Sequence, residues 1–534
     1  MSRLLTSRER RELARQQKRL APSEPSKLSA WYWLVPCIAA FSIYASTLSF
    51  SFVSDDSWIF GVPSLHSWGY FFQLFAHNLP GFPQYYRPLY AVWTLLVYPL
   101  AGPNPFLWHL SKLILHVTAT YLVFRVCREF LESSFAASCS AVLFAIHPIN
   151  IESVAWVLQS DSILYAIFFM CSLLSFLLNL RKPRPLLRWS SIAASSAALL
   201  VKESVIALAV LFCCVAYVKA PGKIQARLKQ AVWAGAPYVA IDLIYLLVRM
   251  LVLRNRFFGV GGLPTPSWRE TLYSSPKALG FYVGKLLWPT HLSPEYDLHM
   301  LSVRTFGMWF SFAVIVLGLA GLTWMAKRYS PLIGIAALLI LLPILPVLIG
   351  IHFFPYGESV HDRYLYLPSV GFCLIAGFVT ENLCRDKEIK PAWVVVGTGI
   401  LLFNVLLCTS QEGFYRNQDT MALRPVELAP ENLRFLKILG GTYFREGKSD
   451  LAIQYFKHAY ELNPGDDGKG NDSSRWALAE AYYYSGDVTE AQRMLQELLN
   501  IGGIPPRVDR SFVEGQLADV DRLSRSMATG RSGQ

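Results

Sequence analysis

Two adjacent carboxylates, Asp55 and Asp56, come directly after an apolar run over residues 30–53. The run is long enough to cross a bilayer, so the pair is expected at the membrane–water boundary. Carboxylates this close repel each other, and partial burial disfavours their charged forms. Such a pair can hold a metal ion, or one member can act as a base near neutral pH. The alternative is that the pair only marks where a helix ends and a polar loop begins.

Other charged residues on the same side of the predicted membrane also lie near the ends of apolar runs. Ionisable groups at membrane depth are costly and usually functional, although at the end of a span they can also simply face water. The turn Lys202-Glu203 has a second interpretation as a salt-bridged structural turn, and His147 as a cap of its span. These charged candidates are Arg87, Glu152, Asp161, Lys202, Glu203 and Arg363.

The composition predicts a polytopic membrane protein. Of 534 residues, 53% are hydrophobic and 16% are charged, against a usual charged share of about 25%. The net charge of +12 does not indicate nucleic-acid binding, because much of it lies in residues 3–19 and in short loops between apolar runs, which is the positive-inside pattern. The nine cysteines lie in these runs or at their edges, so no disulfide is expected.

Eleven spans are predicted, with residues 1–29 as a basic cytoplasmic tail and residues 30–410 as the transmembrane domain. Lys and Arg are dense in the inner loops of this arrangement and sparse in the outer ones, apart from a long outer loop over 253–304. Residues 88–102 are interpreted as a helix along the membrane interface; a span there would invert everything after it. The predicted spans are about 30–53, 106–130, 134–149, 162–180, 189–201, 204–218, 231–252, 305–326, 331–351, 364–383 and 391–409.

The C-terminal part is polar and contains a repeat typical of tetratricopeptide helices, in which small residues let two helices pack closely. The pattern recurs after 39 residues against a usual period of about 34, and the polar insert 465–472 accounts for the surplus. Residues 411–504 are assigned to this domain and 505–534 to a polar tail expected to end in disorder. The repeated positions are Leu439, Gly440, Tyr443, Gly447, Ala452 and Phe456, then Leu478, Ala479, Tyr482, Gly486, Ala491 and Leu495.

A series of motifs in a specific order covers about residues 30–500. They are Asp55-Asp56, Tyr86-Arg87-Pro88-Leu89, Trp108-His109-Leu110 with Leu115-His116, Phe144 to Pro148 with Glu152, Lys202-Glu203, Trp288-Pro289 with Leu292-Ser293, and Arg363 to Phe372. Together they resemble the transmembrane-and-tetratricopeptide O-mannosyltransferases and their bacterial relatives, of the GT-C superfamily. The expected fold is an all-α, GT-C-like membrane bundle of about eleven spans with a C-terminal tetratricopeptide solenoid.

The resemblance implies a sugar donor carried on a polyprenyl phosphate, and transfer with inversion on the extracytoplasmic face, where the repeats also lie. The repeats would bind a protein or glycan acceptor, or another partner. The chain has few repeats where eukaryotic members have long arrays, so the sugar and the acceptor stay open. The expected location is a bacterial inner membrane with its N-terminus cytoplasmic, with membrane lipid as a further partner and no nucleic acid.

The chemistry of a hydroxyl acceptor and a phosphate leaving group assigns the roles. A hydroxyl needs a base to take its proton; Asp55 is the candidate, with Asp56 orienting it or holding a divalent cation, the one cofactor considered. The leaving phosphate needs fixed cations, for which Arg87, Lys202 and Arg363 are the candidates. Further substrate-site candidates are Tyr86, His147, Glu152, Asp161, Glu203 and Tyr364.

A scaffold and a transporter are the two alternatives to this enzyme. A membrane-anchored tetratricopeptide scaffold without catalytic activity needs one anchor, not eleven spans with charged outer turns. A transporter would place ionisable residues near span centres, or Gly/Pro-broken spans in matching halves. Scattered positions for Asp55, Lys202 and Arg363 would favour the scaffold.

Overall fold

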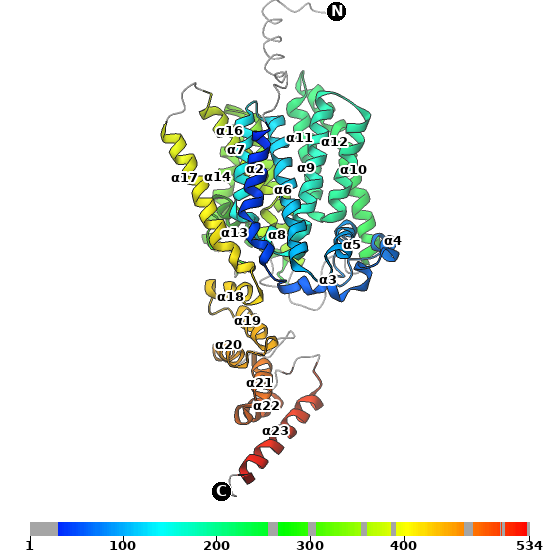
Figure 1. Ribbon diagram of the computed structural model, residues 1–534. Helices are drawn as coiled ribbons and strands as arrows, with labels where there is room; N and C mark the ends of the chain where they lie inside the picture. The colour runs from blue at the N-terminus through cyan, green and yellow to red at the C-terminus, as the bar shows by residue number, and fades with distance from the viewer. Residues whose placement is uncertain are drawn as a thin grey trace, which may run out of the picture.

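The computed structural model describes residues 30–254, 265–296, 306–353, 360–385, 391–463, 474–501, 504 and 508–530. Within these ranges the chain forms helices and turns and no strand, which confirms the all-α prediction. Figure 1 shows a helical bundle with a narrower column of helices, α18 to α23, leaving one end. That end, which also carries α3, α4 and α5, is called the repeat-side end. The predicted cytoplasmic tail 1–29 and the insert 465–472 lie outside the described residues.

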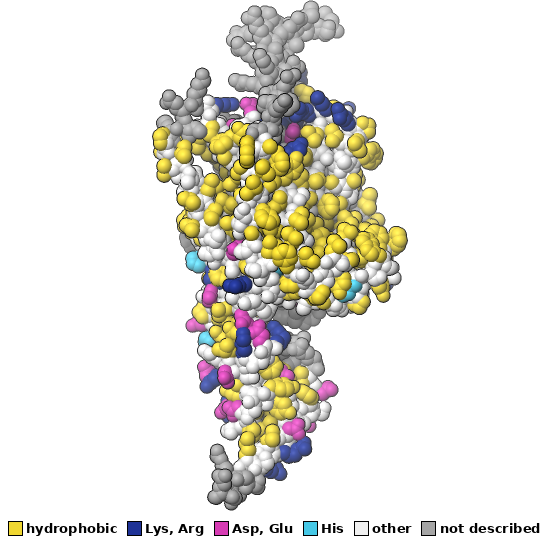
Figure 2. Space-filling view, in the orientation of Figure 1, with side chains coloured by type: hydrophobic (Ala, Val, Ile, Leu, Met, Phe, Trp, Pro, Cys, Tyr) yellow, Lys and Arg dark blue, Asp and Glu magenta, His cyan; other side chains and the backbone are white. Residues whose placement is uncertain are grey.

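Twelve described helices build the bundle, and hydrophobic side chains cover its sides in Figure 2. Helix α6 packs against α2, α7 and α9, so it occupies the middle of the bundle. Its start is set by Asn104, whose side chain accepts the Phe106 N–H at 3.0 Å, as N-cap residues do. The helices are α2 (Trp31–Ile43), α6 (Pro105–Phe130), α7 (Ser134–Ile146), α9 (Ser160–Arg181), α10 (Pro185–Val201), α11 (Ala209–Lys219), α12 (Ile224–Leu253), α13 (Trp268–Leu287), α14 (Phe306–Arg328), α15 (Pro331–Gly350), α16 (Pro368–Leu383) and α17 (Pro391–Gln411).

A described helix, or a pair of short helical segments, lies at each of the eleven predicted span positions. By length and composition alone, six helices among the described residues are long and apolar enough to cross a membrane, or seven if α7 and the following helix, bent by 52°, form one span. Helix α10, with 17 residues, is about 26 Å long, short of the roughly 30 Å hydrocarbon core. Shorter helices are therefore packed among the full-length spans.

Short helical segments form most of the repeat-side end. They are η1 (Ala45–Ser49), η2 (Ser54–Ser57), α3 (Trp58–Gly61), α4 (Phe71–Ala76), α5 (Pro88–Ala101), η5 (Pro148–Asn150), α8 (Ile151–Ala155), η6 (Val157–Gln159), η7 (Glu203–Leu208) and η10 (Asp362–Leu365). Helix α5 has 14 residues, about 21 Å, which is too short to span. Large apolar side chains such as Phe72 and Leu100 are more than 80% exposed here. These features support the interpretation of this segment as interfacial rather than spanning.

The predicted outer loop 253–304 contains a long helix that the sequence analysis missed. Helix α13 begins with a capping box in which the Ser267 hydroxyl accepts the Glu270 N–H, and the Glu270 carboxylate accepts the Ser267 N–H. This reciprocal pair satisfies two N–H groups that a helix start otherwise leaves unbonded. The predicted loop therefore contains a helix of 20 residues.

The repeat column consists of α18 (Gln418–Leu428), α19 (Leu433–Arg445), α20 (Ser449–Leu462), α21 (Ser474–Ser485), α22 (Val488–Ile501) and α23 (Arg510–Gly530). Each packs against the next, as expected of a solenoid. Gly440 is needed at the seam, because a Cβ there would lie 2.6 Å from the Phe456 ring. Gly447 and Gly486 end their helices at positive φ, 74° and 80°, which glycine adopts at little cost.

Helix α23 lies within the predicted polar tail 505–534, whose last residues, 531–534, are outside the described residues. It covers Arg510–Gly530 and packs against α22. Val513 and Val520, seven residues apart, are buried against the neighbouring helix. Two turns of helix bring such positions onto one face, so a sparse apolar stripe is enough to dock an otherwise polar helix.

Candidate functional site

A cavity of about 120 Å³ at the repeat-side end gathers most of the predicted site residues. It contains the predicted base Asp55 and all three predicted phosphate-binding cations. Asp55 lies in η2, Arg87 at the start of α5, Lys202 at the end of α10 and Arg363 in η10. These elements are separated by up to some 300 residues along the chain. The lining residues are Asp55, Leu79, Phe82, Tyr85, Arg87, Tyr90, Leu158, Gln159, Asp161, Lys202, Arg363 and Tyr364.

The two adjacent aspartates have different environments. Asp56 is buried, and its two carboxylate oxygens accept the N–H of Val53 at 3.0 Å and of Leu158 at 2.8 Å. Burial raises the pKa of Asp56, and the two N–H donors oppose this rise. Asp55 is exposed to the cavity. Loss of water around the Asp55 carboxylate raises its pKa, and the positive charge of Arg363 opposes this rise.

From the sequence, Asp56 is predicted to orient Asp55 or to hold a cation, and both roles stay predictions. Both of its oxygens are directed at backbone N–H groups of two different segments. Among the residues that the structure describes, no group of three or more His, Cys, Asp or Glu side chains is arranged to hold a metal ion. Through its two hydrogen bonds Asp56 ties η2 to the segment after α8.

Lys112, which the sequence analysis did not single out, holds the same segment from the other side. Its ammonium group donates to the carbonyl oxygens of Trp156 and, at 3.4 Å, Val157. The Tyr90 hydroxyl donates to the Leu158 carbonyl at 2.9 Å. Residues 156–158 are thus fixed by Asp56, Lys112 and Tyr90. A lysine inside the apolar run of the predicted span 106–130 is the signal that could have found it, because ionisable residues at membrane depth are usually functional.

Arg87 and Lys202 meet on one carboxylate, that of Asp161. The Arg87 Nη1 lies 2.9 Å and the Lys202 Nζ 3.1 Å from the same Asp161 oxygen. Arg87 also forms a bidentate pair with Glu203, at 3.1 Å and 2.6 Å, and Arg249 lies 3.5 Å from Glu203. The turn Lys202-Glu203 is therefore salt-bridged, as its structural interpretation required, and it also presents Lys202 to the cavity.

Arg363 is fixed by Glu152, a buried carboxylate that does not itself line the cavity. The Glu152 carboxylate accepts the backbone N–H of Arg363 at 2.9 Å and a hydrogen bond from the guanidinium Nη1. The guanidinium also lies 5.6 Å from the Trp156 ring and 5.4 Å from the Tyr364 ring. A planar cation held by a carboxylate and two aromatic faces keeps one orientation towards the cavity.

The charged groups of the cavity retain their charges unequally. Burial lowers the pKa of Lys202 to about 8; Asp161 opposes this shift, whereas Arg87 and Arg363 add to it. The Glu203 carboxylate, in contrast, keeps its charge, because Arg87 holds the pKa of Glu203 well below its usual range. Lys202 is thus the cavity cation that can lose its proton within the range of ordinary assays.

Of the six predicted substrate-site residues, Asp161 and Tyr364 line the cavity, whereas Tyr86, His147, Glu152 and Glu203 do not. The Tyr86 hydroxyl donates to the Phe75 carbonyl at 3.0 Å, which fastens the interfacial segment. His147 is buried; its Nδ1 accepts the Ile149 N–H at 3.2 Å and its Nε2 lies 3.1 Å from the Leu286 carbonyl. Both are structural residues, and for His147 this is the capping role considered from the sequence.

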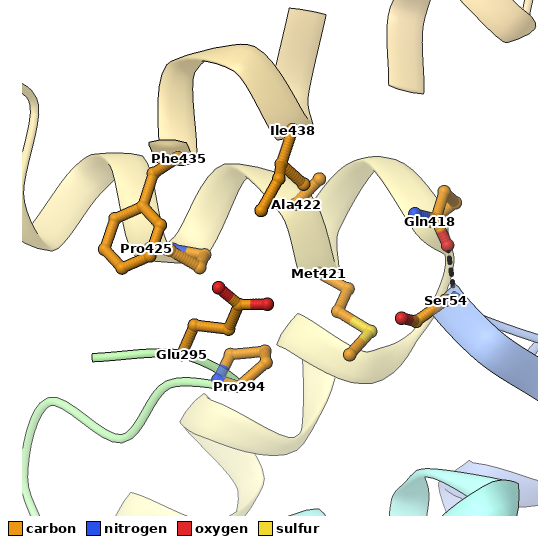
Figure 3. Close-up of a pocket in the computed structure, with 9 residues that line it drawn as sticks. All are labelled: Ser54, Pro294, Glu295, Gln418, Met421, Ala422, Pro425, Phe435 and Ile438. Atoms are coloured by element: carbon orange, nitrogen blue, oxygen red, sulfur yellow. Dashed lines mark hydrogen bonds between the residues drawn. The ribbon is translucent and has the colours of Figure 1, made fainter. Parts of the chain in front are cut away.

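The repeat column touches the site through Ser54. The Ser54 N–H donates to the Gln418 side chain at 2.5 Å, and Ser54 has a positive φ of 48°, which is uncommon for serine. Figure 3 shows Ser54 beside a small pocket between α18, α19 and the segment Pro294-Glu295. Arg424 of α18 also donates to the Leu292 carbonyl at 3.0 Å. The first repeat helix is therefore bound to the residue that precedes Asp55.

Comparison with known proteins supports both the membrane part and the tetratricopeptide part of the chain. A tetratricopeptide repeat model matches residues 433–502, which confirms the repeats. The chain is 25% identical over 477 residues to human "Protein O-mannosyl-transferase TMTC3", covering 80% of this chain and 50% of that protein. It is 26% identical over 429 residues to mouse "Protein O-mannosyl-transferase TMTC4", covering 70% and 57%. The chain's relatives are thus tetratricopeptide-containing protein O-mannosyl-transferases, the family that the motifs indicated.

The chain spans about half the length of the curated relatives it matches. Among solved structures it is similar to an Archaeoglobus fulgidus oligosaccharyltransferase tethered to an acceptor peptide. The identity is 16% and the TM-score 0.36, over 80% of this chain and 59% of that one. A likeness of this size does not by itself define the fold.

Proposed function

We propose that this chain is a membrane glycosyltransferase that transfers a sugar from a polyprenyl-phosphate donor to a hydroxyl acceptor at the repeat-side end. One observation carries the proposal: a carboxylate, Asp55, shares a cavity with Arg87, Lys202 and Arg363 at the end of a membrane bundle. Each of the three cations is held by a carboxylate: Arg87 and Lys202 by Asp161, and Arg363 by Glu152. Fixed guanidinium and ammonium donors that reach one cavity suit a phosphate leaving group.

In this mechanism the acceptor oxygen attacks the anomeric carbon of the sugar on the side opposite the phosphate. The hydroxyl proton passes to Asp55 as the new carbon–oxygen bond forms. The bond from the anomeric carbon to the phosphate oxygen breaks, and the lipid phosphate leaves with the bonding electron pair. Arg363 and Lys202 stabilise the charge that develops on it. Attack from the opposite side inverts the anomeric configuration.

The acceptor would approach past the repeats. The pocket of Figure 3 is walled by apolar side chains of α18 and α19, among them Met421, Pro425 and Phe435. Ser54, which lines this pocket, is the direct neighbour of Asp55. An acceptor segment held against α18 and α19 would therefore have a short path to the base. This arrangement supports a role of the repeats in binding the acceptor.

The proposal is tested by Asp55→Asn in membranes supplied with polyprenyl-phosphate-linked mannose and glucose and a serine-containing peptide. Removing a catalytic base without changing its shape should lower transfer at least about 100-fold. Asp450→Asn, at an exposed position in the first turn of α20, is the matched control and should leave the rate unchanged. Wild-type transfer by a well-folded Asp55→Asn variant would exclude Asp55 as the base.

The scaffold alternative is distinguished by the same experiment. A scaffold would tolerate Asp55→Asn and would transfer no sugar from either donor even in its wild-type form. The convergence of Asp55, Lys202 and Arg363 on one cavity supports the enzyme over the scaffold.

A further inference from the structure

A second and larger hollow lies at the end of the bundle opposite the repeat-side end. It is a cleft of about 750 Å³ between the helix pairs α11–α12 and α14–α15. Its walls are mainly apolar and include Val218, Leu228, Val232, Leu322, Ile335 and Leu338. Nothing in the proposed sugar transfer uses this cleft.

Two cations mark the mouth of the cleft. Arg227 stands near the start of α12; its Nε donates to the Tyr217 carbonyl at 3.0 Å and its guanidinium lies 4.2 Å from the Tyr217 ring. Lys327 stands in the last turn of α14 and is exposed. Both belong to the lining, which includes no Asp or Glu among the residues that are described. The mouth is therefore positive, and Arg227 is held in place by contacts with Tyr217.

The cleft is far from the sugar-transfer cavity. Arg227 and Arg249 both lie on α12, and Arg249 contacts Glu203 of the cavity cluster. The 22 residues between them correspond to about 33 Å of helix, roughly the thickness of a hydrocarbon core. A donor phosphate bound at Arg363 cannot also occupy the mouth at Arg227. The cleft thus has its own head-group position in the other leaflet.

We propose that this cleft binds an anionic two-chain phospholipid from the leaflet opposite the sugar-transfer cavity. Its acyl chains would fill the space between α12 and α15, and its phosphate would meet Arg227 and Lys327. Two of the four wall helices, α12 and α15, are long and apolar enough to cross a membrane. The surrounding medium is then lipid, and an apolar cleft is favourably filled by acyl chains. The cationic mouth selects an anionic head group, because basic pockets between helices attract such lipids.

The test uses the full-length chain purified in detergent and titrated with phosphatidylglycerol or phosphatidylcholine, with bound lipid counted by native mass spectrometry. The wild type should retain phosphatidylglycerol in preference to phosphatidylcholine. The double variant Arg227→Gln/Lys327→Gln should bind phosphatidylglycerol about 30-fold more weakly, given roughly 1 kcal/mol for each cation. The control Lys182→Gln/Arg184→Gln removes two exposed cations of the α9–α10 connection and should bind as the wild type does.

A second variant addresses the apolar walls without changing charge. Gly334 lines the cleft, and a Cβ there would meet its nearest neighbour at an ordinary 3.5 Å. Gly334→Leu should reduce retention of both lipids, and circular dichroism checks that the variant is folded. Equal binding of the two lipids, with no effect of the Arg227 and Lys327 changes, would overturn the proposal. So would displacement of phosphatidylglycerol by polyprenyl phosphate, or a mass showing a second copy in place of lipid. None of these readouts depends on sugar transfer.

Discussion

The Arg363–Glu152 pair of the cavity cluster and the Arg522–Asp519 pair of the repeat column each join an arginine to a carboxylate, but in opposite environments. In the cluster the Arg363 and Glu152 side chains are 14% and 0% exposed. In the column the Arg522 and Asp519 side chains are 78% and 48% exposed. Exposed pairs contribute little to stability, whereas breaking a buried pair leaves a charge without compensation. The comparison teaches that the cluster depends on its charges, while the column depends on its packing.

Burying charges is itself costly, so the cluster is not explained by stability alone. Taking charged groups out of water costs several kcal/mol each, and well-packed apolar residues often serve stability equally well. The cluster directs three cations into one cavity, each fixed by a carboxylate. We interpret this free-energy cost of burying charges as the consequence of holding cations in position for a phosphate.

The largest expected effect comes from Glu152→Gln. It leaves the Arg363 guanidinium in a buried position without its carboxylate, and should lower the free energy of unfolding by about 3–5 kcal/mol. Unfolding in mixed detergent measures this loss. The double variant Glu152→Gln/Arg363→Met should recover much of the stability, since neither charge remains. A loss below about 1 kcal/mol for Glu152→Gln would show that the buried Arg363–Glu152 pair contributes no more to stability than an exposed pair does.

Gly440→Ala tests the other half of the comparison, packing in the column. The added Cβ would lie 2.6 Å from the Phe456 ring, so α19 and α20 must move apart or the ring must shift. Overpacking of this kind typically costs about 1–3 kcal/mol. Thermal unfolding, followed by circular dichroism, measures it. Gly441→Ala, whose Cβ has an ordinary 3.6 Å contact with an arginine end, is the neighbouring control.

The pH dependence of sugar transfer sharpens the role of the cluster. In the proposed mechanism Lys202 meets the leaving phosphate in its protonated form, and burial lowers its pKa to about 8. The charged form is therefore present below pH 8 and lost as the pH rises through it, so transfer should fall about tenfold per pH unit above. On the acid side, the raised pKa of Asp55 makes the base form disappear at a higher pH than for a free Asp, about 3.9.

Lys202→Arg identifies the group behind the alkaline limb. Arginine stays protonated throughout the assay range, so the alkaline decline should vanish while the acid limb remains. The measurement is a pH profile of the transfer rate at saturating donor for both proteins. An unchanged alkaline limb in Lys202→Arg would assign that limb to a different group.

The smallest effect is expected for Arg522→Ala on α23. The pair with Asp519 is largely exposed, so its loss should change stability by less than about 0.5 kcal/mol. The same thermal measurement as for Gly440→Ala applies. A change above 1 kcal/mol would show that surface charge, and not only the buried Val513 and Val520, holds α23 in place.

Local patterns in the chain were enough to predict the membrane bundle, the repeats and half of the residues that line the cavity. An apolar run followed by Asp55, or a small residue such as Gly440 at a fixed offset in a repeat, is a short-range signal that needs no knowledge of distant partners. The start of α13 and the helix α23 were missed although their signals are local, because a capping box and a two-valine stripe are weak against a polar background.

Tertiary structure alone decided which member of Asp55-Asp56 faces the cavity, since that depends on the Leu158 N–H, which is 102 residues away. It also decided that Glu152 fixes Arg363, that Lys112 holds the segment behind the cavity, and that a lipid-sized cleft lies at the far end. The physical reason is burial: a charge taken out of water must find a partner, and the partner is chosen by how distant helices pack.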